Sequence, residues 1–292
     1  MKRGVAAIVY ALITIVLWGT VAAVSKLLLK NITNFQLMFY VALFSTISLF
    51  ILTLFNGKFK SSINLFLKNK SFLILLGILG LGIYQFFYFT SLANAPAAQV
   101  NVLNYLWPIF ILIFSIFILN EKSSFSKWFG FLLGLLGAII VITRGNFLSF
   151  ESIYFYGYLL AIGAAISWGL FSVLSKLKKM DALESVFIFN LVGLVFMFCL
   201  MFLTNSSFKI PVNELFGTMY IGAIPTALAF MFWVKSLQLG KPSTIANLAH
   251  FTPFISLLFI FIILGEEILL SEIIGLVIIV SGIFIQFLGK KK

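Results

Sequence analysis

Residues 97–122 read AAQVNVLNYLWPIFILIFSIFILNEK, and this stretch decides the class of fold. Its apolar part is about 22 residues long, which at ~1.5 Å per residue spans the ~30 Å hydrocarbon layer of a bilayer. Pro108 lies inside the run, and a proline removes one helical hydrogen bond and frees the carbonyl four residues earlier, that of Asn104. A freed carbonyl in lipid needs a partner, so the break is expected to face protein or a water-filled cavity.

The same device returns 145 residues later, in residues 242–267, PSTIANLAHFTPFISLLFIFIILGEE. Pro253 corresponds to Pro108, His250 to Tyr105 and Glu266 to Glu121. Interrupted helices at corresponding places in two halves of a membrane chain point to the substrate site of a transporter.

Composition identifies an integral membrane protein, because 62% of the 292 residues are hydrophobic and 10% are charged, against ~25% charged in soluble domains. The net charge of +12 does not indicate nucleic-acid binding, since the basic residues lie in short loops between apolar runs. Cys199 stands alone in an apolar run, so an intrachain disulfide is impossible, and we expect a small buried side chain.

The chain repeats itself. Residues 17–26, LWGTVAAVSK, return as residues 167–176, SWGLFSVLSK, so the first helix is retained structure and not a signal peptide. The predicted fold is an all-α membrane protein with ten transmembrane helices in two inverted five-helix repeats, residues 1–142 and 156–292. The predicted helices are 5–29, 35–55, 71–93, 97–119, 125–142, 156–178, 184–203, 215–238, 243–264 and 268–288.

The distribution of Lys and Arg predicts the orientation. With the N-terminus inside, sixteen basic residues fall on the cytoplasmic side and four, Lys26, Lys30, Arg144 and Lys209, fall outside. We therefore expect a multi-pass protein of the inner, cytoplasmic membrane with both termini in the cytoplasm.

The fourth predicted helix carries a polar stripe. Asn101, Asn104, Tyr105 and Pro108 recur at helical spacing, with Trp107 beside them. Polar side chains in lipid need other helices or water, which leaves two interpretations. The asparagines either tie helices together while Tyr105 fills the core, or the stripe lines a substrate cavity.

On the ninth predicted helix Asn247, His250 and Pro253 recur at threefold spacing. His250 is the chain's one histidine. It is interpreted as a satisfied hydrogen-bonding residue, a substrate contact or, less simply, a proton carrier.

Aromatic residues complete the predicted substrate site. Trp18 and Trp168 sit inside helices and not at the interfacial belts, beside Gly19 and Gly169, which permit close helix approach. A ring of Trp and Tyr would stack on an aromatic ligand or attract an ammonium group by cation–π contact. Its other members are Tyr84, Tyr88 and Trp233.

The sequence holds no catalytic, metal-binding or cofactor-binding signature. The eight acidic residues fall in loops or at helix ends, where Glu121 and Glu266 are expected to bond neighbouring helix N-termini. With His250 as the one mid-helix ionisable group, we expect transport down the substrate's own gradient, or weak proton coupling through His250.

The Trp-Gly opening, the proline-broken fourth and ninth helices and the Gly-rich fifth and tenth helices resemble the EamA family of the drug/metabolite transporter superfamily. Residues 104–108, NYLWP, are similar to the fourth-helix motif of bacterial aromatic amino-acid exporters, and residues 251–253, FTP, match their ninth helix. Two positions depart from those exporters, which can have Glu where Gln99 stands and Tyr where His250 stands.

The resemblance implies an exporter of amino acids, aromatic or neutral, or of related metabolites, working by alternating access through a central cavity. The partners are then a small-molecule substrate and the lipid bilayer, and the chain acts either as a monomer or as an oligomer. The alternative is efflux of other metabolites or of quaternary ammonium cations, for which the same aromatic ring would serve. A sensor or a subunit without transport activity is a third class.

Overall fold

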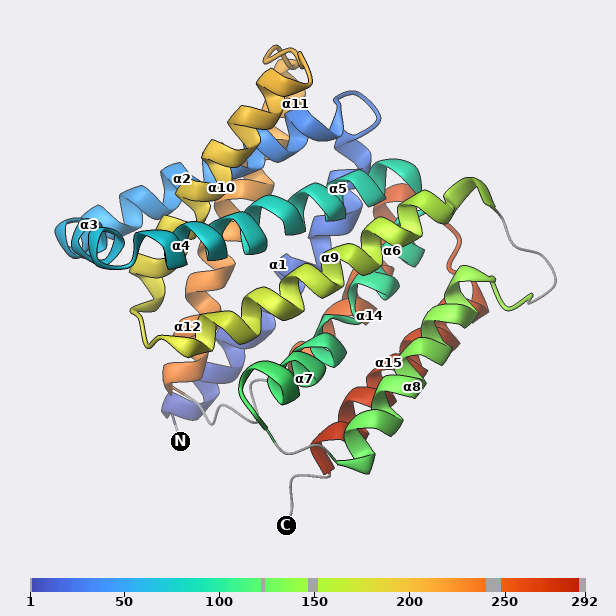
Figure 1. Cartoon of the computed structure of the whole chain (residues 1–292). Helices are drawn as coiled ribbons and strands as arrows, with labels where there is room; N and C mark the ends of the chain where they lie inside the picture. Colours follow the sequence, from blue (N-terminus) through green and yellow to red (C-terminus); the bar gives the residue numbers. More distant parts are fainter. Residues whose placement is uncertain (1, 122–123, 147–151, 240–247, 289–292) are drawn as a thin grey trace. The chain divides into compact units, whose positions relative to one another are not determined.

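The computed structural model describes residues 2–121, 124–146, 152–239 and 248–288 (Figure 1). Within these ranges every regular element is helical. Eight helical runs are long and apolar enough to cross a membrane, and two shorter apolar helices, Thr252–Leu264 and Leu270–Ile285, follow them. The long runs are Gly4–Leu28, Asn34–Phe55, Lys70–Asn94, Ala97–Ile118, Phe125–Ile142, Phe155–Leu177, Ala182–Leu203 and Val212–Trp233.

The chain divides into two compact units, and each draws on both ends of the sequence. Unit 1 comprises residues 1–82 and 180–264, and unit 2 comprises residues 83–179 and 265–292. Each unit thus takes helices from both predicted repeats.

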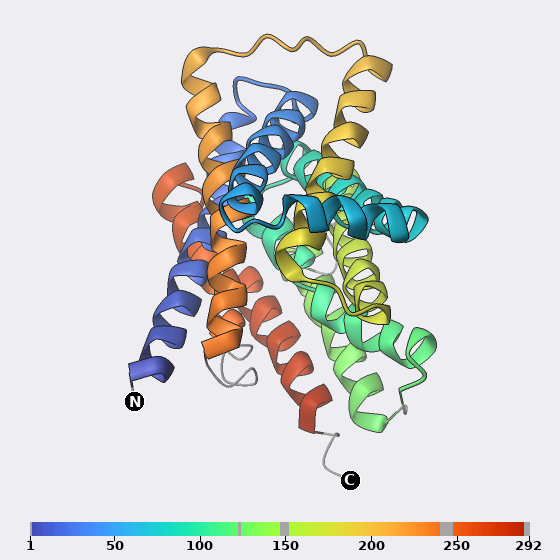
Figure 2. The ribbon, with the colours of Figure 1, turned by 90° about the vertical axis from the view of Figure 1, so that its left-hand side faces the viewer.

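The helices of unit 1 are α1 (Lys2–Leu28), α2 (Asn34–Phe55), α3 (Phe59–Lys68), α4 (Lys70–Gly77), α10 (Ala182–Leu203), α11 (Val212–Ile221), α12 (Ala229–Leu239) and α14 (Thr252–Phe259). α2 packs along α10, and Ser45 Oγ of α2 donates a buried hydrogen bond of 2.6 Å to Asn190 Oδ1 of α10. Thr33 caps α2 through a capping box with Gln36, whose amide also donates to the carbonyl of Ser207. These bonds hold the link between α10 and α11, residues 204–211, against the start of α2 (Figure 2).

The helices of unit 2 are α5 (Tyr84–Asn94), α6 (Ala97–Asn104), α7 (Trp107–Ile118), α8 (Phe125–Ile142), α9 (Phe155–Leu174) and α15 (Leu270–Leu288). α8 and α15 run side by side (Figure 1) because glycines let their backbones touch. A Cβ on Gly137 would lie 2.6 Å from the carbonyl oxygen of Gly275, and one on Gly282 would lie 2.6 Å from that of Gly130. Small residues are the usual means of close helix packing in membranes.

Short π-helical and 3-10 segments interrupt these helices. The π-helical segments are η1 (Ile78–Ile83), η4 (Gly222–Leu228) and η5 (Ile260–Leu264), and the 3-10 segments are η2 (Ser152–Tyr154) and η3 (Ser175–Leu177). η1 and η4 lie 145 residues apart, at equivalent places in the third and eighth predicted helices. π-helical turns often mark functional sites, and no pattern in the sequence predicted these.

Many of the exposed side chains on the outer surfaces of the helices are large and apolar. Phe55, Leu132, Phe117 and Phe202 are each at least 60% exposed. A soluble monomer rarely presents apolar surface on this scale, so these side chains are suited to contact lipid.

Two expectations from the sequence are corrected here. Residues 59–68 were predicted as a loop, but they form the helix α3. This helix contains both apolar and basic residues, and with 10 residues it is too short to span a membrane. Cys199 was expected to be buried and is exposed on α10. In a membrane helix an apolar side chain can be covered by lipid instead of by the protein core.

Candidate substrate-binding site

The proline break predicted for residues 97–122 is confirmed in unit 2. α6 ends at Asn104, and α7 begins at Trp107. Between them the Tyr105 N–H still makes the regular helical bond to the carbonyl of Asn101 and shares it with the carbonyl of Val102, at 3.1 Å each, whereas the Leu106 N–H donates to the carbonyl three residues earlier, that of Leu103, at 3.1 Å. Pro108 is buried at the start of α7, where its missing N–H costs least.

An aromatic group forms beside this break from α5, α6 and α9. The rings of Tyr84 and Tyr88 stack with centroids 5.8 Å apart, and the ring of Trp168 lies 4.9 Å from that of Tyr84. Asn104 Nδ2 donates to Tyr84 Oη at 3.4 Å. The structure therefore brings together four of the predicted site residues, Tyr84, Tyr88, Asn104 and Trp168, which we term the unit 2 aromatic group.

Within the part of the chain that the structure describes, the side-chain amide of Asn104 is hydrogen-bonded through its nitrogen but not through its oxygen. While its nitrogen donates to Tyr84, its oxygen Oδ1 is buried and has no hydrogen-bond partner among the described residues. An unsatisfied buried acceptor costs about 1–3 kcal/mol. Such a group is suited to accept a hydrogen bond from a ligand that enters beside the aromatic rings.

Tyr105 and Trp107 form a second contact at the break, with rings 5.9 Å apart in an edge-to-face arrangement. Tyr105 is 6% exposed, as the core interpretation of this residue requires, whereas Trp107 is half-buried. Asn101 is also half-buried, one turn before Asn104.

Unit 1 contains the equivalent aromatic pair, on α1 and α12. The rings of Trp18 and Trp233 lie 5.4 Å apart, and Trp233 also packs against Ala7 and Ala11 of the core. Trp18 Nε1 donates to the carbonyl of Pro225 at 3.0 Å. Pro225 lies inside the π-helical segment η4, so this segment supplies the acceptor that orients the Trp18 ring.

The second proline break is confirmed at the start of α14. The Phe251 N–H donates to the carbonyl of Leu248 at 3.0 Å, and the helix resumes at Thr252 with Pro253 buried. His250 lies half-buried at this break. Asn247, the remaining predicted contact, lies outside the described residues.

Glycine sets the same close contact in both units. A Cβ on Gly19 of α1 would lie 2.7 Å from Ile255 Cγ2 of α14, and one on Gly169 of α9 would lie 2.7 Å from Phe110 Cβ of α7. The close helix approach expected at Gly19 and Gly169 is confirmed, and in each case the neighbour is a helix that follows a proline break, which was not predicted.

A buried polar chain in unit 2 was not predicted. Tyr158 Oη donates to Gln99 Oε1, and the side chain of Gln99 also hydrogen-bonds to Glu272. Glu272, in the first turn of α15, is 1% exposed and accepts a hydrogen bond from the Leu269 N–H at 2.9 Å. Gln99, which departs from the exporter pattern, therefore has a structural role next to a buried carboxylate.

Glu266 caps a helix, as expected. Its carboxylate accepts hydrogen bonds from the N–H groups of Ala97 and Ala98, the first two residues of α6, at 3.1 and 3.0 Å. Glu121 differs, because its carboxylate pairs with the side chain of Lys127 in the first turn of α8, at 3.2 Å.

These features define a multi-pass membrane protein in which two helices are broken by proline and aromatic side chains gather beside the breaks. The chain belongs to the EamA-like transporter family, whose sequence profile matches it twice, over residues 5–143 and 155–288.

Similar proteins include transporters with and without an assigned substrate. The chain is 31% identical over 183 residues to the aromatic amino acid exporter YddG of Ancylobacter novellus, and the aligned region covers 62% of this chain and 64% of that protein. It is 28% identical over 221 residues to the uncharacterized transporter YoaV of Bacillus subtilis, covering 74% and 75% of the two chains. It is 22% identical over 221 residues to a probable amino-acid metabolite efflux pump of Salmonella typhimurium, covering 71% and 73%.

The fold is also similar to that of a protein of known crystal structure, over almost the whole length of both chains. The TM-score is 0.69 at 25% sequence identity, and the match covers 99% of this chain and 98% of that chain.

Proposed function

We propose that this transporter exports amino acids, aromatic or neutral, or closely related metabolites, by alternating access. In this proposal the chain crosses the cytoplasmic membrane with ten helices in two inverted repeats, and both of its termini lie in the cytoplasm. It is supported by the similarity to an aromatic amino acid exporter and to a probable amino-acid metabolite efflux pump.

The observation that carries the proposal is the unit 2 aromatic group. Its Tyr84 and Trp168 rings offer faces for an aromatic or apolar side chain, and Asn104 Oδ1 beside them is a buried acceptor without a partner in the described chain. An amino acid has an α-ammonium group that can donate to this oxygen, and a hydrogen bond to a charged group stabilises binding by about 1.5–3 kcal/mol.

The same observation disfavours the alternative substrate. A quaternary ammonium cation is attracted to aromatic faces but has no N–H to donate, so it would leave Asn104 Oδ1 unsatisfied. We therefore favour a primary ammonium over a quaternary one.

Purified protein in proteoliposomes tests the proposal. Counterflow is measured with radiolabelled phenylalanine, tyrosine, tryptophan, leucine and threonine, and with tetraethylammonium. We expect exchange of amino acids and little exchange of tetraethylammonium. Exchange of tetraethylammonium without amino acids would establish the alternative, and no exchange of any solute would favour a sensor or a subunit.

Variants locate the site. Asn104→Ala should weaken amino-acid binding by about tenfold or more, because the acceptor is lost, whereas Asn104→Asp keeps an acceptor oxygen. Trp18→Ala, Tyr105→Ala and Trp168→Ala should lower transport with the protein still folded in the membrane. Phe117→Ala is the control, since Phe117 is 66% exposed on the surface of α7. Normal transport by the site variants together with loss in Phe117→Ala would contradict the proposed site.

A further inference from the structure

The helix α3 has two distinct rows of exposed side chains. Phe59, Ile63 and Leu67 recur every four residues and are 37%, 44% and 55% exposed. Lys60, Asn64 and Lys68 recur one position later and are also exposed. Since successive residues of a helix are ~100° apart, the apolar and basic rows are neighbours on its surface.

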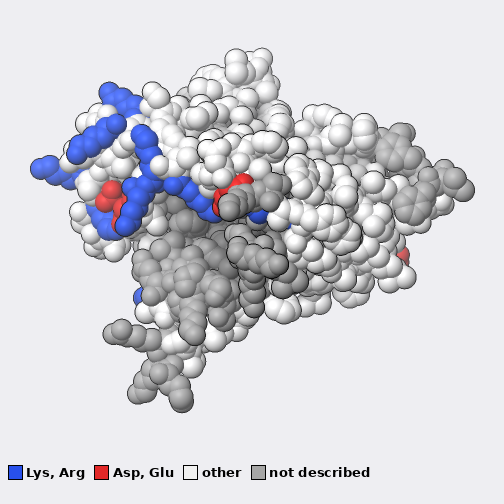
Figure 3. All heavy atoms as spheres, turned by 60° about the horizontal axis from the view of Figure 1, so that its bottom comes forward, with Lys and Arg blue, Asp and Glu red and all other residues white. Residues whose placement is uncertain are grey.

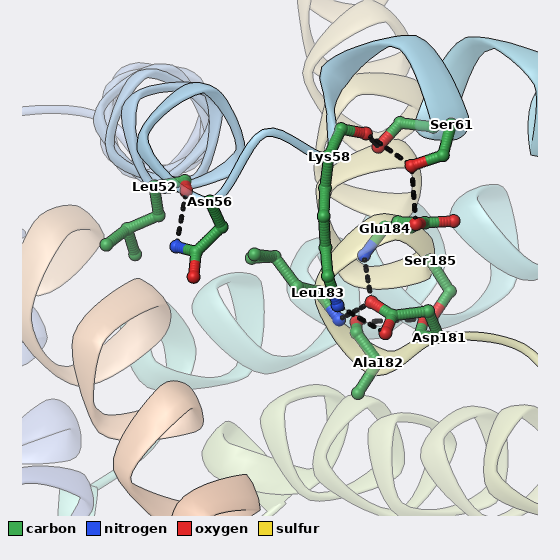
Figure 4. Close-up of polar contacts among 10 residues, drawn as sticks. Leu52, Asn56, Lys58, Ser61, Asp181, Ala182, Leu183, Glu184 and Ser185 are labelled. Atoms are coloured by element: carbon green, nitrogen blue, oxygen red, sulfur yellow. Dashed lines mark hydrogen bonds and ion pairs between the residues drawn. The ribbon is translucent and has the colours of Figure 1, made fainter.

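The opposite side of α3 is fixed to the start of α10 (Figure 4). Lys58, just before α3, forms an ion pair with Asp181, and Ser61 Oγ donates to Glu184 Oε1 at 2.6 Å. Ser62, in the same turn, is 1% exposed. These contacts determine which rows of α3 remain exposed.

The contacts with α10 also determine the depth of α3. Asp181 caps the N-terminus of α10, and Glu184 lies in its first turn, so α3 lies level with the end of a membrane-spanning helix. α3 runs across α10 and not along it (Figure 2). With 10 residues, or ~15 Å, it is too short to cross the bilayer but long enough to lie in the interface.

The apolar row continues the exposed apolar surface of α2. The ring of Phe59 meets the ring of Phe50 of α2 edge to face, with centroids 5.4 Å apart. Phe50, Leu54 and Phe55 are 38%, 48% and 87% exposed on α2, a helix that spans the membrane by length and composition. Lipid that covers α2 would therefore extend onto α3.

The exposed charges on and beside α3 indicate which class of lipid it binds. Lys58 is paired with Asp181, but Lys60, Lys68 and Lys70 are exposed, and Figure 3 shows Lys and Arg gathered at the side of the molecule where α3 lies. A short helix with an apolar face beside a basic face binds at membrane surfaces, and anionic lipids strengthen this binding.

We propose that α3 is an interfacial helix that inserts Phe59, Ile63 and Leu67 among the acyl chains, and that its Lys60 and Lys68, together with Lys70 at the start of α4, bind anionic phospholipid headgroups. The equivalent link of the second repeat, residues 204–211, contains no helix, so this lipid site belongs to the first repeat. The inference does not depend on which solute is carried.

Spin labels test the position of α3. In a Cys199→Ser background, a nitroxide is attached at position 63, 64 or 67, and the protein is placed in phosphatidylcholine nanodiscs with or without phosphatidylglycerol. Power saturation should show that labels at 63 and 67 collide several-fold more with oxygen than with a nickel chelate, and that the label at 64 shows the reverse. Equal nickel accessibility at all three positions would overturn the proposal. Spin–spin broadening at 63 and 67 would overturn it in favour of contact with a second copy of the chain.

Lipid selectivity is measured separately, from the immobilised fraction of spin-labelled phosphatidylglycerol. Changing Lys60, Lys68 and Lys70 together to Gln should lower the preference for phosphatidylglycerol over phosphatidylcholine by about tenfold or more. Lys209→Gln is the control, because Lys209 lies in the link 204–211. Circular dichroism and size-exclusion chromatography verify folding, and Lys60→Gln alone replaces the triple variant should it fail to fold. Unchanged selectivity would refute headgroup binding.

Discussion

Removal of the Glu266 carboxylate is the sharpest test of the structure. This side chain accepts hydrogen bonds from the N–H groups of Ala97 and Ala98, and both alanines are fully buried. Glu266→Ala would leave two N–H groups at the start of α6 without an acceptor and without access to water. Each such group costs about 1–3 kcal/mol, so we expect the free energy of unfolding to fall by about 2–4 kcal/mol after partial relaxation.

Glu266→Gln separates hydrogen bonding from charge. The Gln carbonyl still accepts one or both N–H groups, but the favourable interaction of a negative charge with the helix N-terminus, about 0.3–1 kcal/mol and up to ~2 when partly buried, is lost. We therefore expect Glu266→Gln to fall between wild type and Glu266→Ala.

The matched control is Glu267→Gln, which removes a neighbouring carboxylate that is exposed. Denaturant titration in detergent micelles, followed by tryptophan fluorescence, compares the four proteins. Wild-type stability in Glu266→Ala, or an equal loss in Glu267→Gln, would show that Glu266 does not cap α6.

Three further predictions concern topology, coupling and the anchor of α3. In a Cys199→Ser background, a cysteine at position 146 should react with an impermeant maleimide from outside and one at position 64 from inside, and the reverse pattern would refute the assignment of sides. If transport runs down the substrate gradient, an imposed pH gradient will not drive accumulation of the substrate in proteoliposomes. Accumulation that is lost in Glu272→Gln but kept in His250→Gln would instead identify the buried Glu272 carboxylate as the group that couples transport to protons. Burial raises the pKa of Asp181, but the hydrogen bonds from Lys58 and from the N–H groups of Glu184 and Leu183 outweigh it and lower the pKa below its ordinary value. Because the folded pKa is depressed, the stabilisation is present at neutral pH and is lost as the pH falls below about 4. As the pH falls below this value, a spin label at position 64 should become more mobile in the protein with Asp181. In the Asp181→Asn variant the mobility of the same label should not depend on pH. Constant mobility in the protein with Asp181 would contradict the role of the Lys58–Asp181 ion pair.

Local features of the sequence predicted much of the fold. Hydropathy located the helices within a few residues, and the two prolines located the breaks, because each depends on a property of one short stretch. The capping role of Glu266 followed in the same way, from a carboxylate at the end of one hydrophobic run and a helix start elsewhere.

Features that depend on packing between distant segments were not predicted. The π-helical segments η1 and η4 have no clear local signature in the sequence, although they occupy equivalent positions in the two repeats. The network of Tyr158, Gln99 and Glu272 joins three separate helices, and no spacing in the sequence predicts it. α3 was missed because its apolar row is short and its lysines are typical of a cytoplasmic loop.

The two repeats supply similar frames with different chemistry. In both, a Trp-Gly helix packs on the helix that follows a proline break, through Gly19 in one and Gly169 in the other. Yet the amide–phenol pair of Asn104 and Tyr84 has no equivalent, because the residues 145 positions later are Ala249 and Ala229. Under the proposed alternating access, repeated features such as Gly19 and Gly169 are suited to the motion that this mechanism requires of both halves, whereas the unrepeated pair is suited to select the solute. On this reasoning Asn104→Ala should raise the concentration of every amino acid that gives half-maximal transport, because all of them share the ammonium group that Oδ1 accepts, whereas Gly169→Ala, which places a Cβ 2.7 Å from Phe110 Cβ, should lower the maximal rate of transport.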